Sequence, residues 1–520
     1  MSENSRVVKA AGVIGAATLL SRILGFIRDA VIAWFFGAGF SSDAFIAAFR
    51  IPNLLRRLFA EGSLSSAFIP VFTQYIVNRG QPEAYRLARS AFRLLSVFLI
   101  LVTLGGILLS PWIVKFVAPG FAADKFSLTV TLTRLMFPYI FFVGLVALCM
   151  GILNVLGHFA APALAPVLLN ISIIGSVFFI SPSLTEPAVG LAVGVLIGGV
   201  LQLALQLPAL MRHGFRFWEK AKLLHPGLKQ VGTLIVPAIL GGAVYQINIV
   251  IGTILGSLLA EGSVTYLYFA DRLVQFPLGV FAIATATAVL PSLSRQAAAE
   301  DFEALSDTFV HALKLVFFIS IPAMVGLIVL REPIVALLFQ RGEFDQSATR
   351  LTAQALLYYS LGLWAFSAVR IVAATFFAMQ DTRTPVKMAG ISIITNIILG
   401  VVLMKPLAHG GLALATSLAS MLNLGLLIVA LKTKLGSLGW RKIALSVCRT
   451  LSCSIAMGVG VWLAGRVIVP VENVTLTGLL GGVAGTVTIG ICIYVGLSYV
   501  LKSPELRIVL AEVRKGISKK

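Results

Sequence analysis

The chain has 520 residues, of which 58% are hydrophobic and only 12% are charged. A soluble domain carries about 25% charged residues, so this composition excludes a string of soluble domains and predicts an integral membrane protein with many spans. The net charge of +20 reflects an excess of Lys and Arg, and such an excess in a membrane protein is typical of cytoplasmic loops that face anionic lipid. We therefore expect membrane lipids, and no nucleic acid, as partners of the basic residues.

The apolar stretches predict fourteen transmembrane helices, because a hydrocarbon core about 30 Å thick needs about 20 apolar residues. The first stretch follows Arg6 and Lys9 as in a signal peptide. No small-residue cleavage site precedes Arg22, so we expect an uncleaved span. In chain order the predicted spans lie near 10–36, 41–75, 94–118, 127–155, 162–182, 187–211, 229–257, 262–292, 309–331, 347–379, 385–405, 409–431, 444–466 and 475–501.

Basic residues predict the orientation, since cytoplasmic loops carry the excess of lysine and arginine. With the N-terminus inside and the sides alternating, the inside segments hold 25 basic residues and the outside segments hold 6. This asymmetry favours an even number of spans, with both termini in the cytoplasm.

Rare residue types recur at a spacing of about 222 residues, which indicates an internal duplication. Leucine matches arise by chance in an apolar chain, whereas ordered matches of Pro, Gly and Arg do not. Six spans in each copy give both copies the same membrane orientation, as in transporters that bind substrate between two lobes near mid-membrane. The matched pairs include Arg50 with Arg272, Pro111 with Pro333 and Gly120 with Gly342.

The duplication predicts an all-α polytopic fold of two parallel six-helix repeats plus two C-terminal helices. The N-terminal lobe would cover 1–222 and the C-terminal lobe 223–440. Two extra helices would occupy 441–502, followed by a basic cytoplasmic tail at 503–520. The period does not account for the two extra helices.

Ten arginines but only four acids fall inside the predicted spans, when Arg331 and Arg466 at the last positions of their spans are counted with the loops. A mid-bilayer arginine costs roughly 2.5–3.5 kcal/mol on insertion scales, so such a group needs a wet cavity, a partner or the interface. Arginines near span ends can reach the interface with their long side chains, and we place Arg134, Arg350 and Arg449 in this group.

The first two predicted spans hold most of the remaining charges, with five arginines and three acids within 40 residues. Arg28 and Asp29 are adjacent and diverge in direction, so we expect a poor direct pair. Gly25 and Pro52 suggest thin or broken helix at their positions. The charged residues of this segment are Arg22, Arg28, Asp29, Asp43, Arg50, Arg56, Arg57 and Glu61.

Arg50 and Arg57 could each pair with Asp43 or Glu61, or lie at an interface. Arg272 occupies the repeat position of Arg50, which would place cationic groups on both lobes of one cavity. Arginine binds phosphate well because its planar fork is bidentate and always charged. The excess of arginine therefore favours an anionic, phosphorylated substrate over the cations that a drug exporter carries. Scattered structural ion pairs are the alternative interpretation.

Sequence patterns for catalysis are absent. The chain lacks the G-x-x-x-x-G-K-[ST] phosphate loop and the H-E-x-x-H motif. Its five histidines and four cysteines have no metal-ligand spacing, and no Ser/His/Asp constellation can be assembled. We expect a transporter and not an enzyme, with no cofactor and no bound metal.

Five blocks of the sequence carry a resemblance to a known family. They are Ser21 to Asp29 (SRILGFIRD), Asp43 to Phe45, Pro52 to Gly62 (PNLLRRLFAEG), Ala270 to Arg272 with Pro277, and Gln380 to Pro385 (QDTRTP). They resemble the MurJ (MviN) family, the lipid II flippases of bacterial peptidoglycan synthesis. This family belongs to the multidrug/oligosaccharidyl-lipid/polysaccharide exporter (MOP) superfamily. The resemblance runs from about residue 8 to about residue 500.

The resemblance implies two six-helix lobes in a V shape around a central cavity, and a lipid-tail groove on the last two helices. It implies that Arg22, Arg28, Arg56 and Arg272 engage the diphosphate, with Asp29 as the acidic partner of Arg28. As supporting cavity charges and polar groups we name Ser21, Asp43, Arg57, Glu61 and Asp271.

Some members of the family bind sodium through acids on the seventh and eleventh helices. Here those helices offer Asn248, Asn396 and Gly400 without an acid, so we predict no sodium site.

The implied function is translocation of lipid II, the undecaprenyl-diphosphate-linked peptidoglycan precursor, from the inner to the outer leaflet of the bacterial cytoplasmic (inner) membrane by alternating access. This step serves cell-wall biogenesis and cell shape, so the cell-wall synthesis machinery is a further expected partner. Three alternatives stay open: an O-antigen-type flippase for another lipid-linked oligosaccharide, a cation-coupled drug exporter, and a non-transporting scaffold.

Overall fold

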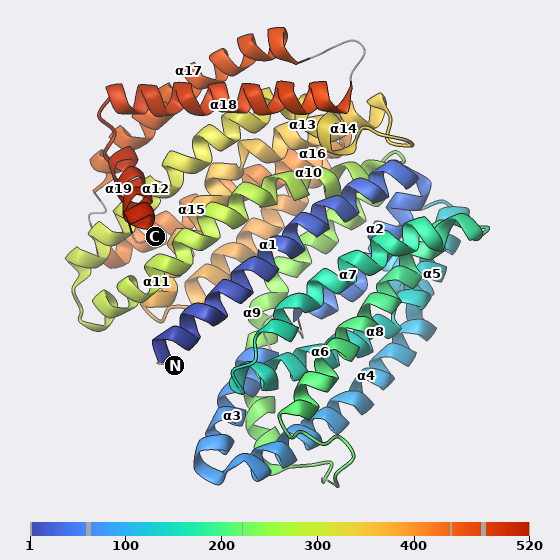
Figure 1. The fold of residues 1–520 in the computed structure, drawn as a ribbon. Helices are drawn as coiled ribbons and strands as arrows, with labels where there is room; N and C mark the ends of the chain where they lie inside the picture. Colours follow the sequence, from blue (N-terminus) through green and yellow to red (C-terminus); the bar gives the residue numbers. More distant parts are fainter. Residues whose placement is uncertain (1–2, 59–63, 221, 437–438, 470–474, 519–520) are drawn as a thin grey trace. The chain divides into compact units, whose positions relative to one another are not determined.

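The computed structural model describes residues 3–58, 64–220, 222–436, 439–469 and 475–518, and all regular structure in these ranges is helical (Figure 1). The chain forms two compact units, residues 1–265 and 266–520. Helices suit a bilayer because each one satisfies its own backbone hydrogen bonds.

The first unit is a bundle of apolar helices. α7 packs against α1 and α8, and Figure 1 shows α1 beside α7. Small residues permit this close approach, since a side chain on Gly194 or Gly198 of α8 would collide with α7. The helices are α1 (Glu3–Phe36), α2 (Phe40–Leu58), α3 (Leu64–Arg79), α4 (Gln81–Val117), α5 (Ala123–Met136), α6 (Pro138–Val155), α7 (Ala160–Phe179), the 3-10 helix η2 (Ser181–Ser183), α8 (Ala188–Arg212) and α9 (Pro226–Ser257).

The second unit has its core where α12 packs against α15 and α17, and α17 packs in turn against α18. α10 begins at the unit boundary. The helices are α10 (Ser263–Pro277), the π-helical turn η3 (Leu278–Ala282), α11 (Ile283–Ala298), α12 (Phe302–Val329), α13 (Arg331–Phe339), α14 (Gln346–Leu361), α15 (Leu363–Ala378), α16 (Arg383–Leu435), α17 (Trp440–Ile468), α18 (Leu476–Val500) and α19 (Pro504–Ser518).

Within the described ranges, nine helices are long and apolar enough to cross a membrane. A tenth arises if α14 and α15, which meet at a bend of 42°, are one span. The protein is therefore a multi-pass membrane protein, as its composition predicted.

Two local expectations about the first spans are wrong. α1 runs unbroken through Gly25, and α2 runs unbroken through Pro52. The second predicted span corresponds to two helices, α2 and α3, on either side of residues 59–63. Glu61, one of the predicted supporting charges, lies in that segment and so outside the described residues.

The long helix α16 folds back on itself at Ala408, whose φ of 48° and ψ of −131° are not helical. Ser392 Oγ donates to the carbonyl of Ala419 at 2.8 Å, which connects the two arms. Lys434 Nζ, near the end of the helix, lies 2.5 Å from Oδ2 of Asp381, just before its start. A straight helix of 53 residues would be about 80 Å long, so the two arms are antiparallel. The turn falls between the spans predicted at 385–405 and 409–431.

The boundary between the compact units differs from the boundary of the predicted duplication. α9 packs on α2, α3 and α4, so the first unit extends to residue 265. The lobe boundaries at 222 and 440 describe a relationship within the sequence, and they stay a prediction.

Candidate functional site

A buried ion pair on α1 forms the centre of the candidate site. Arg28 and Asp29 are 6% and 1% exposed. Oδ1 of Asp29 accepts hydrogen bonds from Arg28 Nε at 3.0 Å and from Nη2 at 2.6 Å. The expectation of a poor pair is therefore wrong, because the long arginine side chain bends back to its neighbour's carboxylate. Each charge offsets the cost of burying the other.

Asn170 on α7 completes this cluster, and the sequence analysis missed it. Its Oδ1 accepts from Arg28 Nη1 at 3.1 Å, and its Nδ2 donates to the carbonyl of Ser21 at 3.1 Å. Asn170 is buried and lies beside Gly25 of α1, where a Cβ would be 3.9 Å from Asn170 Nδ2, an ordinary van der Waals contact. The feature of the sequence that could have identified Asn170 is its single amide side chain within the apolar span predicted at 162–182.

The other predicted cavity arginines of the first unit are less buried. Arg22 is exposed and lies on α1, six positions before Arg28. Arg56 on α2 is half-buried, and its Nε and Nη2 donate to Oδ1 of Asn53 at 3.1 and 3.0 Å. Arg57 follows it on α2 and is also half-buried. The structure thus joins Arg28, Asp29 and the Ser21 backbone through Asn170, and it pairs Arg56 with Asn53.

Asp43, predicted as a supporting charge, caps the N-terminus of α10. Its Oδ1 accepts from the backbone N and Oγ1 of Thr265 at 3.0 and 2.7 Å. Its Oδ2 accepts from the backbone N of Gly262 at 2.7 Å and lies 3.2 Å from Nζ of Lys125. Lys125 is therefore the cation that pairs with this carboxylate.

Arg272 and Asp271 lie on α10 in the second unit, and both are half-buried. Arg272 Nη2 donates to the hydroxyl of Tyr268 at 3.2 Å, and its guanidinium carbon lies 5.3 Å from the centre of that ring. Gln275 Nε2 donates to Oδ1 of Asp271 at 3.4 Å. The π-helical turn that follows Pro277 breaks the helix just beyond these residues, and such turns are frequent at functional sites.

The chemistry of these groups suits recognition of an anion. The planar guanidinium of arginine matches phosphate oxygens. Arg22 is exposed and Arg56 and Arg272 are half-buried, whereas Arg28 is buried and donates to Asp29 and Asn170. Within the described ranges, no group of three or more His, Cys, Asp and Glu side chains could hold a metal ion. The absence of a bound metal stays a prediction.

The helical arrangement is shared with solved transporters. An inward-facing structure of a multidrug resistance MATE family transporter of the MOP superfamily aligns with a TM-score of 0.66 at 18% identity. The alignment covers 82% of this chain and 98% of that chain. At this identity the likeness concerns the fold alone, and it defines the class as a MATE-like transporter fold.

Comparisons at higher identity define the family. A structure described as lipid II flippase MurJ in an inward closed conformation aligns with a TM-score of 0.78 at 26% identity, over 94% of this chain and 98% of that chain. The probable lipid II flippase MurJ of Vibrio cholerae serotype O1 is 41% identical over 437 residues, 82% of each chain. The lipid II flippase MurJ of Burkholderia cenocepacia is 38% identical over 428 residues, 81% of this chain and 83% of that one.

The family model for lipid II flippase MurJ matches residues 32–479. The chain therefore belongs to the lipid II flippase MurJ family, a family of transporters and not of enzymes. This confirms the resemblance carried by the five sequence blocks.

Proposed function

We propose that this protein flips lipid II from the inner to the outer leaflet of the bacterial cytoplasmic membrane. Membership of the lipid II flippase MurJ family over residues 32–479 carries the proposal. The exposed Arg22 and the half-buried Arg56 and Arg272 support it, since accessible guanidinium groups suit a diphosphate. The flipped precursor would pass to the cell-wall synthesis machinery.

The proposed topology has fourteen transmembrane helices. Nine helices and the bent α14–α15 pair are apolar and long enough, and the second arm of α16 adds another span. The apolar helices α1 and α9 and the α2–α3 pair complete the number. The excess of basic residues in alternate loops supports a cytoplasmic position for both termini.

The proposed lobes are two parallel six-helix repeats in a V-shaped arrangement around one cavity. They cover 1–222 and 223–440, with two extra helices at 441–502 for the lipid tail and a basic tail at 503–520. The match with a MurJ structure over 94% of the chain supports this arrangement.

In the proposed mechanism the diphosphate binds to Arg22, Arg28, Arg56 and Arg272, while Asp29 orients Arg28. The headgroup enters laterally from the inner leaflet and the polyprenyl tail stays in lipid. Rocking of the lobes then exposes the headgroup to the outer side. The residues proposed to support the cavity charges are Ser21, Asp43, Arg57, Glu61 and Asp271.

Alternating access requires that something bind differently to the two states. Moving one charge through the full membrane potential is worth about 2.3 kcal/mol per 100 mV. A diphosphate that moves outward from a negative cell interior gains this energy, and the membrane potential is therefore the proposed driver.

The test is to deplete the protein in its own cell and to follow which leaflet holds lipid II. We expect lipid II to accumulate in the inner leaflet, and wild type but not Arg272→Ala to relieve it. Arg350→Ala is the matched control, because Arg350 is exposed near a span end and is not a proposed cavity residue. Variant levels in the membrane are measured in parallel.

The alternatives predict other outcomes. An unchanged lipid II distribution, in a cell without a redundant transporter, would favour the O-antigen-type flippase or the scaffold. A scaffold would also tolerate simultaneous replacement of all four cavity arginines. A cation-coupled drug exporter would tolerate Arg272→Ala and depend on its acidic residues.

A further inference from the structure

The loop between α8 and α9, residues 213–225, is packed against α4. Phe215 is fully buried, and its ring centre lies 5.4 Å from that of Tyr85. The ring of Phe217 lies 5.1 Å from that of Phe92. Residue 221 of this loop lies outside the described residues.

Polar contacts hold the same side of the loop. Arg89 Nη1 lies 2.6 Å from Oε2 of Glu219, and Arg93 Nη2 donates to the carbonyl of Glu219 at 2.9 Å. Ser90 Oγ donates to the carbonyl of Lys222 at 2.6 Å. The side chain of Arg89 is only 7% exposed and that of Glu219 is 43% exposed, so the arginine end of this ion pair is shielded from water and the carboxylate end only partly. The loop is a fixed part of the first unit.

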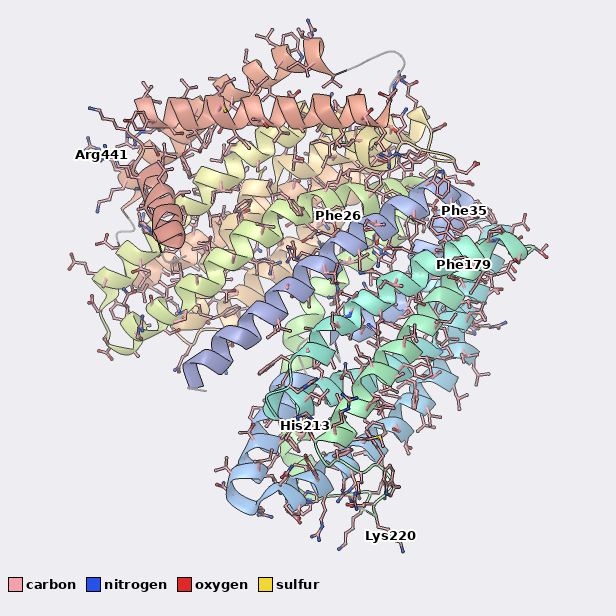
Figure 2. All side chains as sticks on the ribbon, viewed as in Figure 1. Phe26, Phe35, Phe179, His213, Lys220 and Arg441 are labelled. Carbon is pink, nitrogen blue, oxygen red and sulfur yellow. The ribbon has the colours of Figure 1, made fainter. Side chains whose placement is uncertain are left out.

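The other side of the loop carries cations and large apolar groups. Three of its members alternate with Phe215, Phe217 and Glu219: Arg216 and Lys220 are exposed, and Trp218 between them is 67% exposed. Leu224 is 74% exposed. Figure 2 shows Lys220 at the tip of the loop. We call this surface the loop's outer face, and it consists of Arg216, Trp218, Lys220, Lys222, Leu223 and Leu224.

We propose that the loop's outer face binds the anionic phospholipid headgroups of the leaflet that it faces. The loop follows the end of α8 and precedes α9, so it lies where apolar helices leave the hydrocarbon core. Tryptophan is enriched at this depth, and Lys and Arg there are attracted to anionic lipid. Glu219 is the only acid in the loop, and it is shared by Arg89 at 2.6 Å and Arg216 at 3.6 Å, so the outer face keeps a net positive charge through Lys220 and Lys222. With the proposed orientation this leaflet is the cytoplasmic one, and only that assignment rests on the proposed function.

A lipid surface fits this face better than bulk water does. Exposed tryptophan and leucine side chains would be unfavourable in water, whereas the membrane interface takes the ring and the ammonium groups together. Because the loop is already fixed by α4, lipid binding would need little ordering of the loop. The face would therefore set the depth of the first unit in the bilayer.

The test uses the full chain in nanodiscs of equal phosphatidylcholine and phosphatidylglycerol. The photo-reactive residue p-benzoylphenylalanine replaces Trp218 in one variant and Phe217 in another. We expect position 218 to cross-link to lipid and to favour phosphatidylglycerol. Position 217 is the internal control, because its side chain packs on α4 and should cross-link to protein.

Charge removal then tests the headgroup preference. Each basic residue near an anionic surface multiplies lipid binding by about fivefold. Lys220→Gln with Lys222→Gln should therefore cut the preference at position 218 by up to about 25-fold, toward parity. Lys115→Gln, at the opposite end of α4, should leave it unchanged.

Three results would overturn the inference: no lipid cross-link at 218, equal capture of both lipids, or capture of lipid II in place of phosphatidylglycerol in discs that contain both. None of these readouts requires transport, so a failure here is distinct from a failure of the flippase proposal.

Discussion

Asp43 and Thr265 are joined by two hydrogen bonds, from the backbone N at 3.0 Å and from the hydroxyl at 2.7 Å, although they are 222 residues apart. That separation equals the period of the proposed duplication, so the bonds would connect equivalent positions if the chain has the two proposed repeats. The carboxylate of Asp43 caps α10 in the way that aspartate caps a free helix end. Asp43 of α2 thus caps the N-terminus of the helix that carries Arg272.

Replacement of Asp43 by asparagine should destabilise the protein. The substitution keeps the shape of the side chain but removes the charge that faces the buried Lys125. Loss of one partner of a buried pair costs about 3 kcal/mol, so the thermal unfolding midpoint in detergent should fall. Glu261→Gln is the control, since that carboxylate is 57% exposed and 3.4 Å from Lys125. An equal fall of the unfolding midpoint in both variants would contradict the assignment of Asp43 as the buried partner of Lys125.

Asn170→Leu should abolish function while the protein still reaches the membrane. Leucine fills a similar volume, but it removes the amide that connects Arg28 to the carbonyl of Ser21. Growth of a strain that depends on the variant, with its membrane level, is the measurement. Asn170→Asp keeps an acceptor for Arg28 and should retain more activity than leucine does. Ser172→Ala is the control, because Ser172 lies on the same helix but bonds to Gly194 of α8; a strain that depends on this variant should grow normally. Growth of the strain with Asn170→Leu would show that Arg28 needs no amide.

Tyr268→Phe should reduce lipid II flipping in proteoliposomes by about fivefold, which corresponds to one hydrogen bond of about 1 kcal/mol. The variant loses the bond from Arg272 Nη2 at 3.2 Å but keeps the ring beneath the guanidinium. Arg272→Ala should abolish flipping. If the two variants were equally inactive, the tyrosine would have a larger role than orienting Arg272.

Ala408→Gly should stabilise the turn of α16. At φ 48° and ψ −131°, Ala408 has the conformation of the first central residue of a type II′ turn, where glycine is preferred. Relief of this strain should raise stability by about 1 kcal/mol. Ala413→Gly in the following helical arm is the opposite control, and it should lower stability by about 1 kcal/mol. Thermal unfolding of both variants would test the sign, and a drop for Ala408→Gly would reject the turn geometry.

The sequence predicted an all-helical membrane protein because an apolar stretch of sufficient length is almost obliged to form a helix in lipid, and nine or ten such spans are present in the described ranges. It also located the break in α16, which falls between two predicted spans. The charges were harder to place. Asp43 and Lys125 are 82 residues apart, and nothing local indicates that they meet.

Asn170 shows the same limit within the site. Its role depends on which face of α7 meets α1, and an apolar sequence hardly specifies that face. The expectation that Arg28 and Asp29 form a poor pair failed for a different reason. The direction in which a side chain leaves the helix does not restrict where the end of a side chain as long as arginine can reach. Glu61 stays a prediction, because it lies outside the described residues.

The C-terminal helix α19 offers a test by pH. Glu505, at its start, is buried; its carboxylate lies 3.0 Å from Lys314 Nζ and accepts from the hydroxyls of Ser446 and Ser503 at 2.8 Å each. Burial alone would raise its pKa, but these bonds outweigh burial and lower the pKa to about 2 from the ordinary 4.5. A lowered carboxyl pKa stabilises the folded form above pH 4.5, and this contribution disappears as the pH falls toward 2.

The docking of α19 should therefore be constant from pH 7 to about pH 4.5 and should weaken by about 3 kcal/mol at lower pH. A spin label at position 511, in a chain with serine at the exposed Cys448 and Cys492, reports the mobility of the helix. Glu505→Gln should leave Lys314 without its carboxylate, so the label should be mobile across the whole range. A wild-type label that becomes mobile already at pH 6 would mean that another group, with a higher pKa than Glu505, holds the helix in place.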